Sequence, residues 1–128
     1  MARPSKGAAG ELFAARYLRE HGYQIVAANY RCRLGEVDMI AQDGAYIAFV
    51  EVKTRREDAL YAPRAAVTAA KRRRLVATSA LYLSQHPSPL QPRFDVIEVV
   101  TDPSDPLRVV RIEHIPGAYE AGDLHEAF

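Results

Sequence analysis

The sequence predicts an α/β fold with a mixed central β-sheet of about five strands flanked by helices. Three observations lead to this class. A helical pattern opens the chain, three runs rich in β-branched and aromatic residues follow it, and a second helical pattern precedes two more runs of that kind. The 128 residues match the size of one ordinary domain. We place this domain at residues 1–116 and predict a mobile acidic tail at residues 117–128.

The composition is that of a soluble globular protein, with 48% apolar and 26% charged residues. A net charge of +1 argues against a globally basic nucleic-acid binder, and the lack of a glycine-rich phosphate loop argues against an NTPase. No apolar run reaches the roughly 20 residues that span a bilayer, and the first residues lack a signal-peptide core. The single cysteine, Cys32, allows neither an internal disulfide nor a cysteine-cluster zinc site. We therefore expect a cytoplasmic protein with no membrane partner and no small-molecule cofactor.

The first helix is predicted to begin after Ser5, a suitable N-cap, and to run to His21, with Gly22 as its stop. At about 100° per residue, Glu11 falls in the middle of the inward arc that Ala14, Ala15 and Leu18 also occupy. An apolar residue is expected there, because a buried carboxylate without a partner is strongly disfavoured. Glu11 is therefore either satisfied by an arginine or backbone N–H groups, or directed at a functional site.

Residues 23–28 are predicted as the first strand, and residues 29–35 as the connection that follows it. This connection mixes Arg31 and Arg33 with an aromatic residue, which is typical of loops that contact DNA and of exposed loops in general. Two further strands, at residues 37–41 and 46–53, are joined through Gln42-Asp43-Gly44-Ala45, and Asp-Gly is a strong hairpin signal.

The central hairpin carries a compact charged group. Side chains alternate along a strand, so Glu51 and Lys53 share one face of the second strand, while Glu36 and Asp38 share one face of the first. Two carboxylates brought together repel each other unless a cation lies between them. Asp38 and Glu51 offer the hard oxygen ligands that Mg²⁺ or Mn²⁺ prefers, and Lys53 offers a positive charge for a developing anion. Glu36 is either a further ligand or a solvated strand end.

The order of these residues resembles a known family pattern. Asp38, twelve intervening residues and then Glu51-Val52-Lys53 look like the core of the PD-(D/E)XK nuclease superfamily, which has the restriction-endonuclease-like fold shared with archaeal Holliday junction resolvases. More narrowly, the chain resembles the small bacterial YraN-like proteins through three blocks, GELFAARYLREHGY, GEVDMIA and FVEVKTR. The resemblance covers residues 7–100. Val37 stands where a proline often precedes the aspartate, as is common in this superfamily.

The resemblance implies a metal-dependent endonuclease that hydrolyses phosphodiester bonds in DNA. Mg²⁺ or Mn²⁺ would be held by Asp38 and Glu51, with Glu11 and the backbone carbonyl of Val52 as further ligands, and Lys53 would hold or deprotonate the attacking water. A structure-specific activity on junctions or branched DNA, in repair or recombination, fits the resolvase-like members. Cutting two strands would require a homodimer. RNA carries the same phosphates and stays open as a substrate.

The second helix is predicted from Ala69 to Gln85, with Thr68 as its cap and His86-Pro87 at its end. Its expected apolar stripe comprises Ala69, Val76, Ala77, Ala80 and Leu83. Cations are unfavourable in the first turns of a helix, and a bound phosphate would remove that penalty. The predicted nucleic-acid contacts are therefore the basic run Lys71, Arg72, Arg73 and Arg74 together with Arg31, Arg33, Arg55 and Arg56.

Residues 93–100 and 107–115 are predicted as the last two strands, the second of them a polar edge strand. The four histidines show no grouping that would support a histidine-based mechanism. Two other functional classes stay open. The chain could be a nucleic-acid-binding accessory module that keeps the nuclease fold with little or no activity of its own. Alternatively, the charged group could be a structural ion-pair network, with the basic helix binding another protein or RNA.

Overall fold

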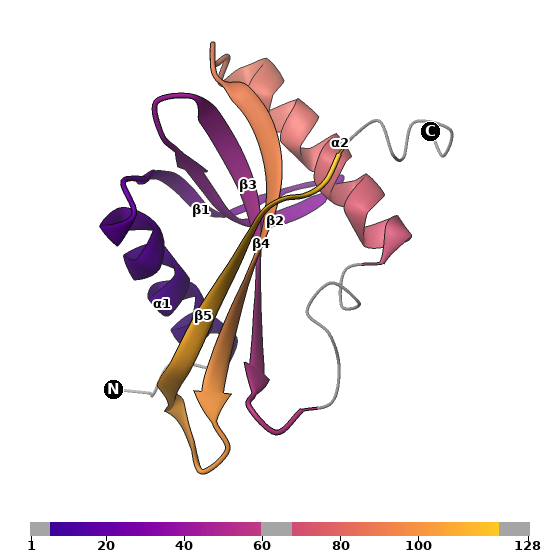
Figure 1. Cartoon of the computed structure of the whole chain (residues 1–128). Helices are drawn as coiled ribbons and strands as arrows, with labels where there is room; N and C mark the ends of the chain where they lie inside the picture. The colour runs from indigo at the N-terminus through magenta and orange to yellow at the C-terminus, as the bar shows by residue number, and fades with distance from the viewer. Residues whose placement is uncertain (1–5, 60–67, 121–128) are drawn as a thin grey trace, which may run out of the picture.

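The computed structural model describes residues 6–59 and 68–120 (Figure 1). It confirms the predicted α/β class, with a five-stranded mixed sheet and one helix on either side. The elements, in chain order, are α1 (Lys6–Glu20), β1 (Gln24–Cys32), β2 (Gly35–Gln42), β3 (Tyr46–Arg56), α2 (Ala69–Gln85), β4 (Gln91–Asp102) and β5 (Asp105–Tyr119). None of the helices in these two ranges is long and apolar enough to cross a membrane.

The strands lie in the order β1-β2-β3-β4-β5. Only β3 and β4 are parallel, and their pairing runs from Tyr46↔Gln91 to Arg56↔Thr101. The other neighbours are antiparallel. A parallel pair needs a long crossover, and this one contains α2. The crossover places α2 over one face of the sheet, whereas α1 covers the other (Figure 1).

Each helix closes its own hydrophobic core. Leu75 and Tyr82 of α2 pack with a buried cluster made up of Val37, Ile40, Ile47, Phe49, Phe94, Val96 and Tyr119. Leu18 of α1 packs with Ala14, Ala15, Met39, Ala41, Ala48, Val50, Ile97 and Val99. The side chains of β3 alternate between these clusters, as expected for a central strand that is apolar on both faces.

Helix α1 ends as predicted, because Gly22 adopts the left-handed conformation with φ 87°. Its predicted N-cap, Ser5, lies outside the described residues. Gly10 lets the helix approach β3 closely, since a Cβ at this position would collide with the Oγ1 of Thr54. Glu11, the next residue, is thereby held near the end of β3 that carries Glu51 and Lys53.

Three sequence-based predictions differ from the structure. Residues 29–32 belong to β1 and pair with β2, for example Arg31↔Glu36, so most of the predicted connection is strand and only residues 33–34 make the turn. Strand β5 extends through Tyr119, so the predicted boundary at residue 116 falls inside it. The buried residues of α2 are Leu75, Thr78, Ser79 and Tyr82, whereas of the predicted stripe Val76 and Leu83 pack against the core only partly buried. In that stripe, Ala69 and Ala80 are exposed.

Candidate functional site

The candidate site lies where β2 and β3 separate. Their antiparallel ladder runs from Gln42↔Ile47 to Met39↔Val50 and ends there. One residue further along, the same register would set Asp38 opposite Glu51. Here a side-chain hydrogen bond takes the place of the backbone hydrogen bonds between the strands. The backbone N–H of Val52 donates to Oδ2 of Asp38 over 2.8 Å. The fork thus fixes the Asp38 carboxylate between the two strands, beside Glu51.

The electrostatics of Asp38 show how closely the acids approach each other. Burial, followed by the negative charge of Glu51, raises the pKa of Asp38 to about 7, although the hydrogen bond from Val52 lowers it. The charge of Glu11 adds to the increase. Glu11 is half-buried on α1, the helix that covers the face of the sheet opposite to α2, and its negative charge acts on Asp38 from there. The charges of the two other predicted acids, Glu51 and Glu11, thus both raise the pKa of Asp38.

Two lysines neutralise Glu51, which is almost completely buried. Its Oε1 lies 3.2 Å from Nζ of Lys53 and 2.5 Å from Nζ of Lys71. Burial and the nearby Lys71 lower the pKa of Lys53. Burial lowers the pKa of Lys71, but its hydrogen bonds to Glu51 and Lys53 and the negative charges of Glu51 and Asp38 together raise the pKa above its usual value. The predicted pairing of Glu51 with Lys53 is therefore present, and Lys71 joins it from the first turn of α2.

The carboxylates of the candidate site meet part of what a hard divalent cation requires. Within residues 6–59 and 68–120, no three or more His, Cys, Asp or Glu side chains are grouped so that they would hold a metal. Glu11 is thus not part of a preformed three-acid group. The Asp38–Glu51 pair does supply carboxylate oxygens, and the pKa of Asp38 is raised first by burial and then by the negative charge of Glu51. Mg²⁺ is commonly held by one or two carboxylates together with water and substrate phosphates, so the pair fits this ion.

Arg55 does not fit its predicted role as a phosphate contact. Its side chain is buried, and its Nε lies 2.9 Å from Oε1 of the fully buried Glu98, although the two groups are not aligned as a hydrogen bond. Its Nη1 donates to the backbone carbonyls of Arg56 and Ala59. The correction follows from the parallel register of β3 and β4, which sets Lys53 opposite Glu98 and thus brings this acid beside Arg55.

The other predicted basic contacts lie at the surface. Arg31 pairs with Glu36 over 3.0 Å, and both side chains are exposed, so Glu36 is a solvated strand residue in this structure. Arg56 pairs with Asp58, also at the surface. Exposed pairs of this kind contribute little to stability and can be exchanged for a phosphate. Arg33 is exposed in the turn between β1 and β2.

The four consecutive basic residues at the start of α2 point in different directions around the helix axis, as consecutive residues of a helix must. Thr68 caps the helix as predicted, because its side chain accepts from the backbone N–H of Lys71. The Lys71 side chain points inward to Glu51, and the Arg72 guanidinium lies over the ring of Tyr119, 5.0 Å from its centre. Arg74 is exposed, and Arg73 is partly exposed. Lys71 is therefore a member of the acidic site rather than a separate phosphate contact.

A second buried charged group was not predicted. Asp95 is fully buried and accepts two hydrogen bonds from Arg93, one from the backbone of Gly117 and one contact of 2.8 Å from Nε2 of His114. Arg93 also donates to the hydroxyl of Tyr23. Although burial opposes ionisation, the bonds from His114 and Arg93 lower the pKa of Asp95. Arg93 and Asp95 are neighbours on one face of β4, but Tyr23, His114 and Gly117 join them only through the tertiary fold, which is why sequence reading missed this group.

Comparison with known sequences decides the family. Residues 10–99 match the sequence profile described as "Uncharacterised protein family UPF0102". The chain belongs to the UPF0102 family. This result confirms the resemblance to the YraN-like proteins. The matched region extends from α1 to β4 and includes Glu11, Asp38, Glu51, Lys53 and Lys71.

Several UPF0102 proteins are similar over most of their length. The one from Symbiobacterium thermophilum is 50% identical over 109 residues, which cover 84% of this chain and 92% of that protein. The one from Nocardia farcinica is 50% identical over 98 residues, or 76% of this chain and 77% of the relative. The one from Geobacter metallireducens is 42% identical over 117 residues, or 91% and 93% of the two chains. The similarity thus extends over essentially the whole described fold.

Proposed function

We propose that this UPF0102 protein is a metal-dependent endonuclease that hydrolyses phosphodiester bonds in DNA. The observation that carries the proposal is the fork between β2 and β3. It holds Asp38 beside Glu51, with Lys53 on the same face of β3, and burial together with Glu51 raises the pKa of Asp38 to about 7. This arrangement agrees with the PD-(D/E)XK pattern of the sequence, and perturbed acids beside a lysine are typical of catalytic sites.

In the proposed mechanism, Asp38, Glu51 and the backbone carbonyl of Val52 would hold Mg²⁺ or Mn²⁺, and Glu11 would add negative charge from α1. The bound ion would neutralise charge on the scissile phosphate and make a coordinated water more acidic. Lys53, as an ammonium group beside Glu51, would orient the attacking water and offset the charge that develops on the phosphate, and the proton of the water would pass to solvent. A bond forms from the water oxygen to phosphorus, the bond to the leaving oxygen breaks, and that oxygen then accepts a proton from solvent.

Lys71 has a separate role in this proposal. Its ammonium group lies on Oε1 of Glu51, and its position at the start of α2 puts it beside the exposed arginines of the same turn. When a substrate phosphate and a divalent cation enter, Glu51 has another positive partner, and Lys71 can transfer its contact to the phosphate. Arg73 and Arg74 extend the same positive surface for the nucleic-acid backbone.

Cleavage of a panel of end-labelled nucleic acids tests the proposal. The panel contains a linear duplex, a single strand, a flap and a four-way junction, each with Mg²⁺ or Mn²⁺ or with a chelator, and a single-stranded RNA. We expect metal-dependent cutting of at least one DNA, and a loss of about 100-fold or more in the variant Lys53→Met, because a charge that acts in the transition state is removed. Cutting that persists in the chelator, or at full rate in Lys53→Met, would contradict the mechanism.

A second candidate function rests on one observation, the neutralisation of Glu51 by two lysines. An accessory module with the nuclease fold could keep these ion pairs as part of its structure and bind nucleic acid through α2. For such a module, we expect binding to members of the panel without cutting in either metal. Binding would then be the same in wild type and in Lys53→Met.

A further inference from the structure

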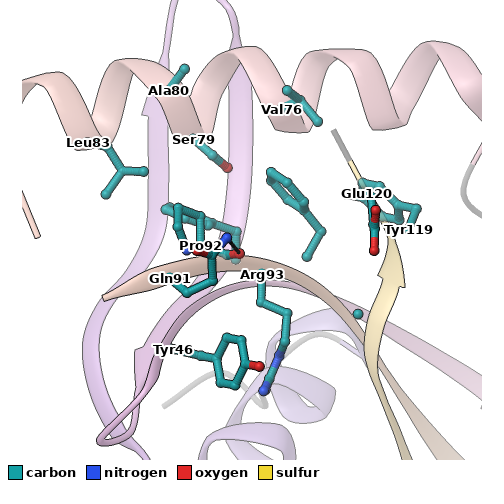
Figure 2. A pocket seen from close by; sticks show the side chains of 13 residues that line it. Tyr46, Val76, Ser79, Ala80, Leu83, Gln91, Pro92, Arg93, Tyr119 and Glu120 are labelled. Atoms are coloured by element: carbon teal, nitrogen blue, oxygen red, sulfur yellow. Dashed lines mark hydrogen bonds between the residues drawn. The ribbon is translucent and has the colours of Figure 1, made fainter. Parts of the chain in front are cut away.

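The last strand, β5, leaves one edge of the sheet open. It stands at the end of the strand order, next to β4 alone (Figure 1). The backbone N–H and C=O groups on its outer side therefore have no neighbouring strand in the part of the chain that the structure describes. The final residues of β5 pack beside α2, where Tyr119 and Glu120 line a groove between this helix and the sheet (Figure 2). The free part of the edge comes before this groove.

The middle of the free edge is regular. From Arg111 to Ile115, each residue of β5 pairs with the successive residue of β4, and register shifts occur only on either side of this stretch. The opposite edge of the sheet, β1, is interrupted by a bulge between Ile25 and Ala27 and by Asn29, which has a positive φ of 54°. Of the two edges, β5 is therefore the better suited to accept another strand.

Two exposed charges on the regular stretch lack partners. Arg111 and Glu113 are exposed, and neither forms an ion pair within residues 6–59 and 68–120. The β4 residue opposite Glu113 is Glu98, a second acid, which is fully buried and paired with Arg55. Like charges directly opposite each other are destabilising, so a cation supplied to Glu113 from outside would be favourable.

The residues around Ile112 are complementary to themselves in an antiparallel pair. When two copies of β5 pair with Ile112 opposite Ile112, Arg111 of each copy lies opposite Glu113 of the other. Hydrogen-bonded and non-hydrogen-bonded pairs alternate along an antiparallel ladder, so a two-fold pair requires opposed residues to differ by an even number of positions. Arg111 and Glu113 differ by two, which makes both charge contacts possible at once.

We propose that β5 binds β5 of a second copy of this chain, antiparallel and centred on Ile112, and so joins two five-stranded sheets into one. The backbone groups of the free edge then form a ladder, and each copy supplies the arginine that Glu113 of the other lacks. Val110, which is 37% exposed, gains a neighbouring strand as well. The same surface serves both copies, as a two-fold interface requires.

The dimer would present both acidic sites on one side of the joined sheet. Glu51 and Lys53 lie on the face that α2 covers, and a two-fold axis perpendicular to the sheet makes this face common to both copies. Pairing sets Lys53 level with Glu98 and Glu98 level with Glu113, one residue from the axis. Five strand spacings separate β3 from its copy, or about 24 Å.

Two sites related by a two-fold axis match the symmetry of the two strands of a DNA duplex, so the dimer would suit cutting of both strands. This consequence rests on the proposed function, whereas the interface itself does not.

Sedimentation velocity over a series of protein concentrations tests the interface with charge-reversal variants. Arg111→Glu and Glu113→Arg each set like charges opposite each other at both contacts of the pair. The two variants mixed in equal amounts restore both contacts, because each acid of the first then lies opposite an arginine of the second. Arg108→Glu is the matched control, since it reverses the same charge at an exposed position of β5 that would face Pro116 of the second copy. Thermal unfolding checks that each variant is folded.

We expect wild type and Arg108→Glu to reach the mass of a dimer as the concentration is raised. In Arg111→Glu and in Glu113→Arg alone, the dissociation constant should rise by about 30-fold, and the mixture should return it to the wild-type range. Wild type that stays monomeric at every concentration, equal dimerisation by all variants, or a mixture as dissociated as its components would overturn the inference. Dimers that cut no member of the panel would refute the nuclease but not the interface. Cutting by a wild type that stays monomeric would refute the interface but not the nuclease.

Discussion

At the scale of single residues, Asp38 connects the fold and the proposed chemistry. It closes the fork by accepting from the backbone of Val52, and at the same time it faces the repulsion of Glu51. The hydrogen bond from Val52 lowers the pKa of Asp38, whereas burial and the repulsion of Glu51 raise it, and the raising effects are the larger. Because its pKa is about 7 in the folded protein and about 3.8 for an ordinary aspartate side chain, the folded state binds the proton more tightly than the unfolded state does.

The sign of this shift predicts how stability depends on pH. A raised carboxyl pKa stabilises the fold fully below the unfolded pKa, and this contribution is lost as pH rises toward about 7. The asparagine side chain in Asp38→Asn keeps an oxygen that can accept the hydrogen bond from Val52, but this side chain cannot ionise. We therefore expect wild type to lose thermal stability relative to Asp38→Asn between pH 5 and pH 8, as measured by circular dichroism. A difference that does not change with pH, or that changes in the opposite direction, would contradict the environment assigned to Asp38.

Asp95 shows the opposite balance, since its donors lower the pKa of a carboxyl that burial alone would raise. Replacing it leaves the Arg93 charge and the Gly117 N–H without their acceptor. For Asp95→Ala we expect a loss of about 3–5 kcal/mol in the free energy of unfolding, which urea denaturation measures. The exposed pair Arg56–Asp58 provides the control, because Asp58→Ala should cost less than about 1 kcal/mol. A small loss in Asp95→Ala would mean that the network does not hold β5 to β4.

At the scale of elements, α2 illustrates what a sequence reveals about a helix. Its ends were predictable, because capping by Thr68 and termination at His86-Pro87 depend only on local residues. Its buried face was not predictable from apolar periodicity, because hydroxyl residues, Thr78 and Ser79, occupy the inward positions between Leu75 and Tyr82. The extent of β1 was missed for a similar reason. Residues 29–32 have loop-like chemistry, and only pairing with β2 makes them a strand.

Helix α2 also gives a prediction about metal binding. In this structure, the Lys71 ammonium contacts the carboxylate that is proposed to hold the cation. Lys71→Met removes this competing charge and keeps much of the side-chain volume. We expect Mn²⁺ to bind this variant about tenfold more tightly than wild type, as follows from removing one unit charge a few ångström away in a partly solvated site. Isothermal titration measures the affinity, with Arg74→Met, an exposed change on the same helix, as the control. Weaker binding by Lys71→Met would show that Lys71 does not compete with the metal.

At the scale of the whole molecule, the candidate site combines one local feature with several distant ones. Asp38 and Glu51 could be placed together from the sequence, because a single hairpin with an Asp-Gly turn joins their strands. Lys71 could not be placed there, since it reaches Glu51 only through the packing of α2, and neither could the contact of the neighbouring Arg72 with Tyr119 of β5. The positive charge that Lys71 brings to the acids is therefore a property of the tertiary structure.

The arginines show the same limit. Sequence position alone grouped Arg55 with the exposed basic residues, because it follows the proposed catalytic lysine by two positions. The parallel register of β3 and β4 instead buries it against Glu98. Alternation along β3 puts Arg55 on the face of Glu51 and Lys53, but only the neighbouring strand determines whether that face is covered. The positive surface is therefore smaller than the sequence suggested and is concentrated at the start of α2 and the turn after β1.

The measurement that most directly tests the central claim is the single-turnover rate at which Asp38→Asn cleaves the best DNA of the panel in Mn²⁺. Glu36→Gln is the matched control, because Glu36 is an acid of the same strand, two residues away, that pairs with Arg31 at the surface. We predict a loss of about 100-fold or more in Asp38→Asn and a rate within about twofold of wild type in Glu36→Gln. Of these two acids, only Asp38 would contact the metal. Cleavage by Asp38→Asn at the wild-type rate would show that the fork between β2 and β3 is not the active site.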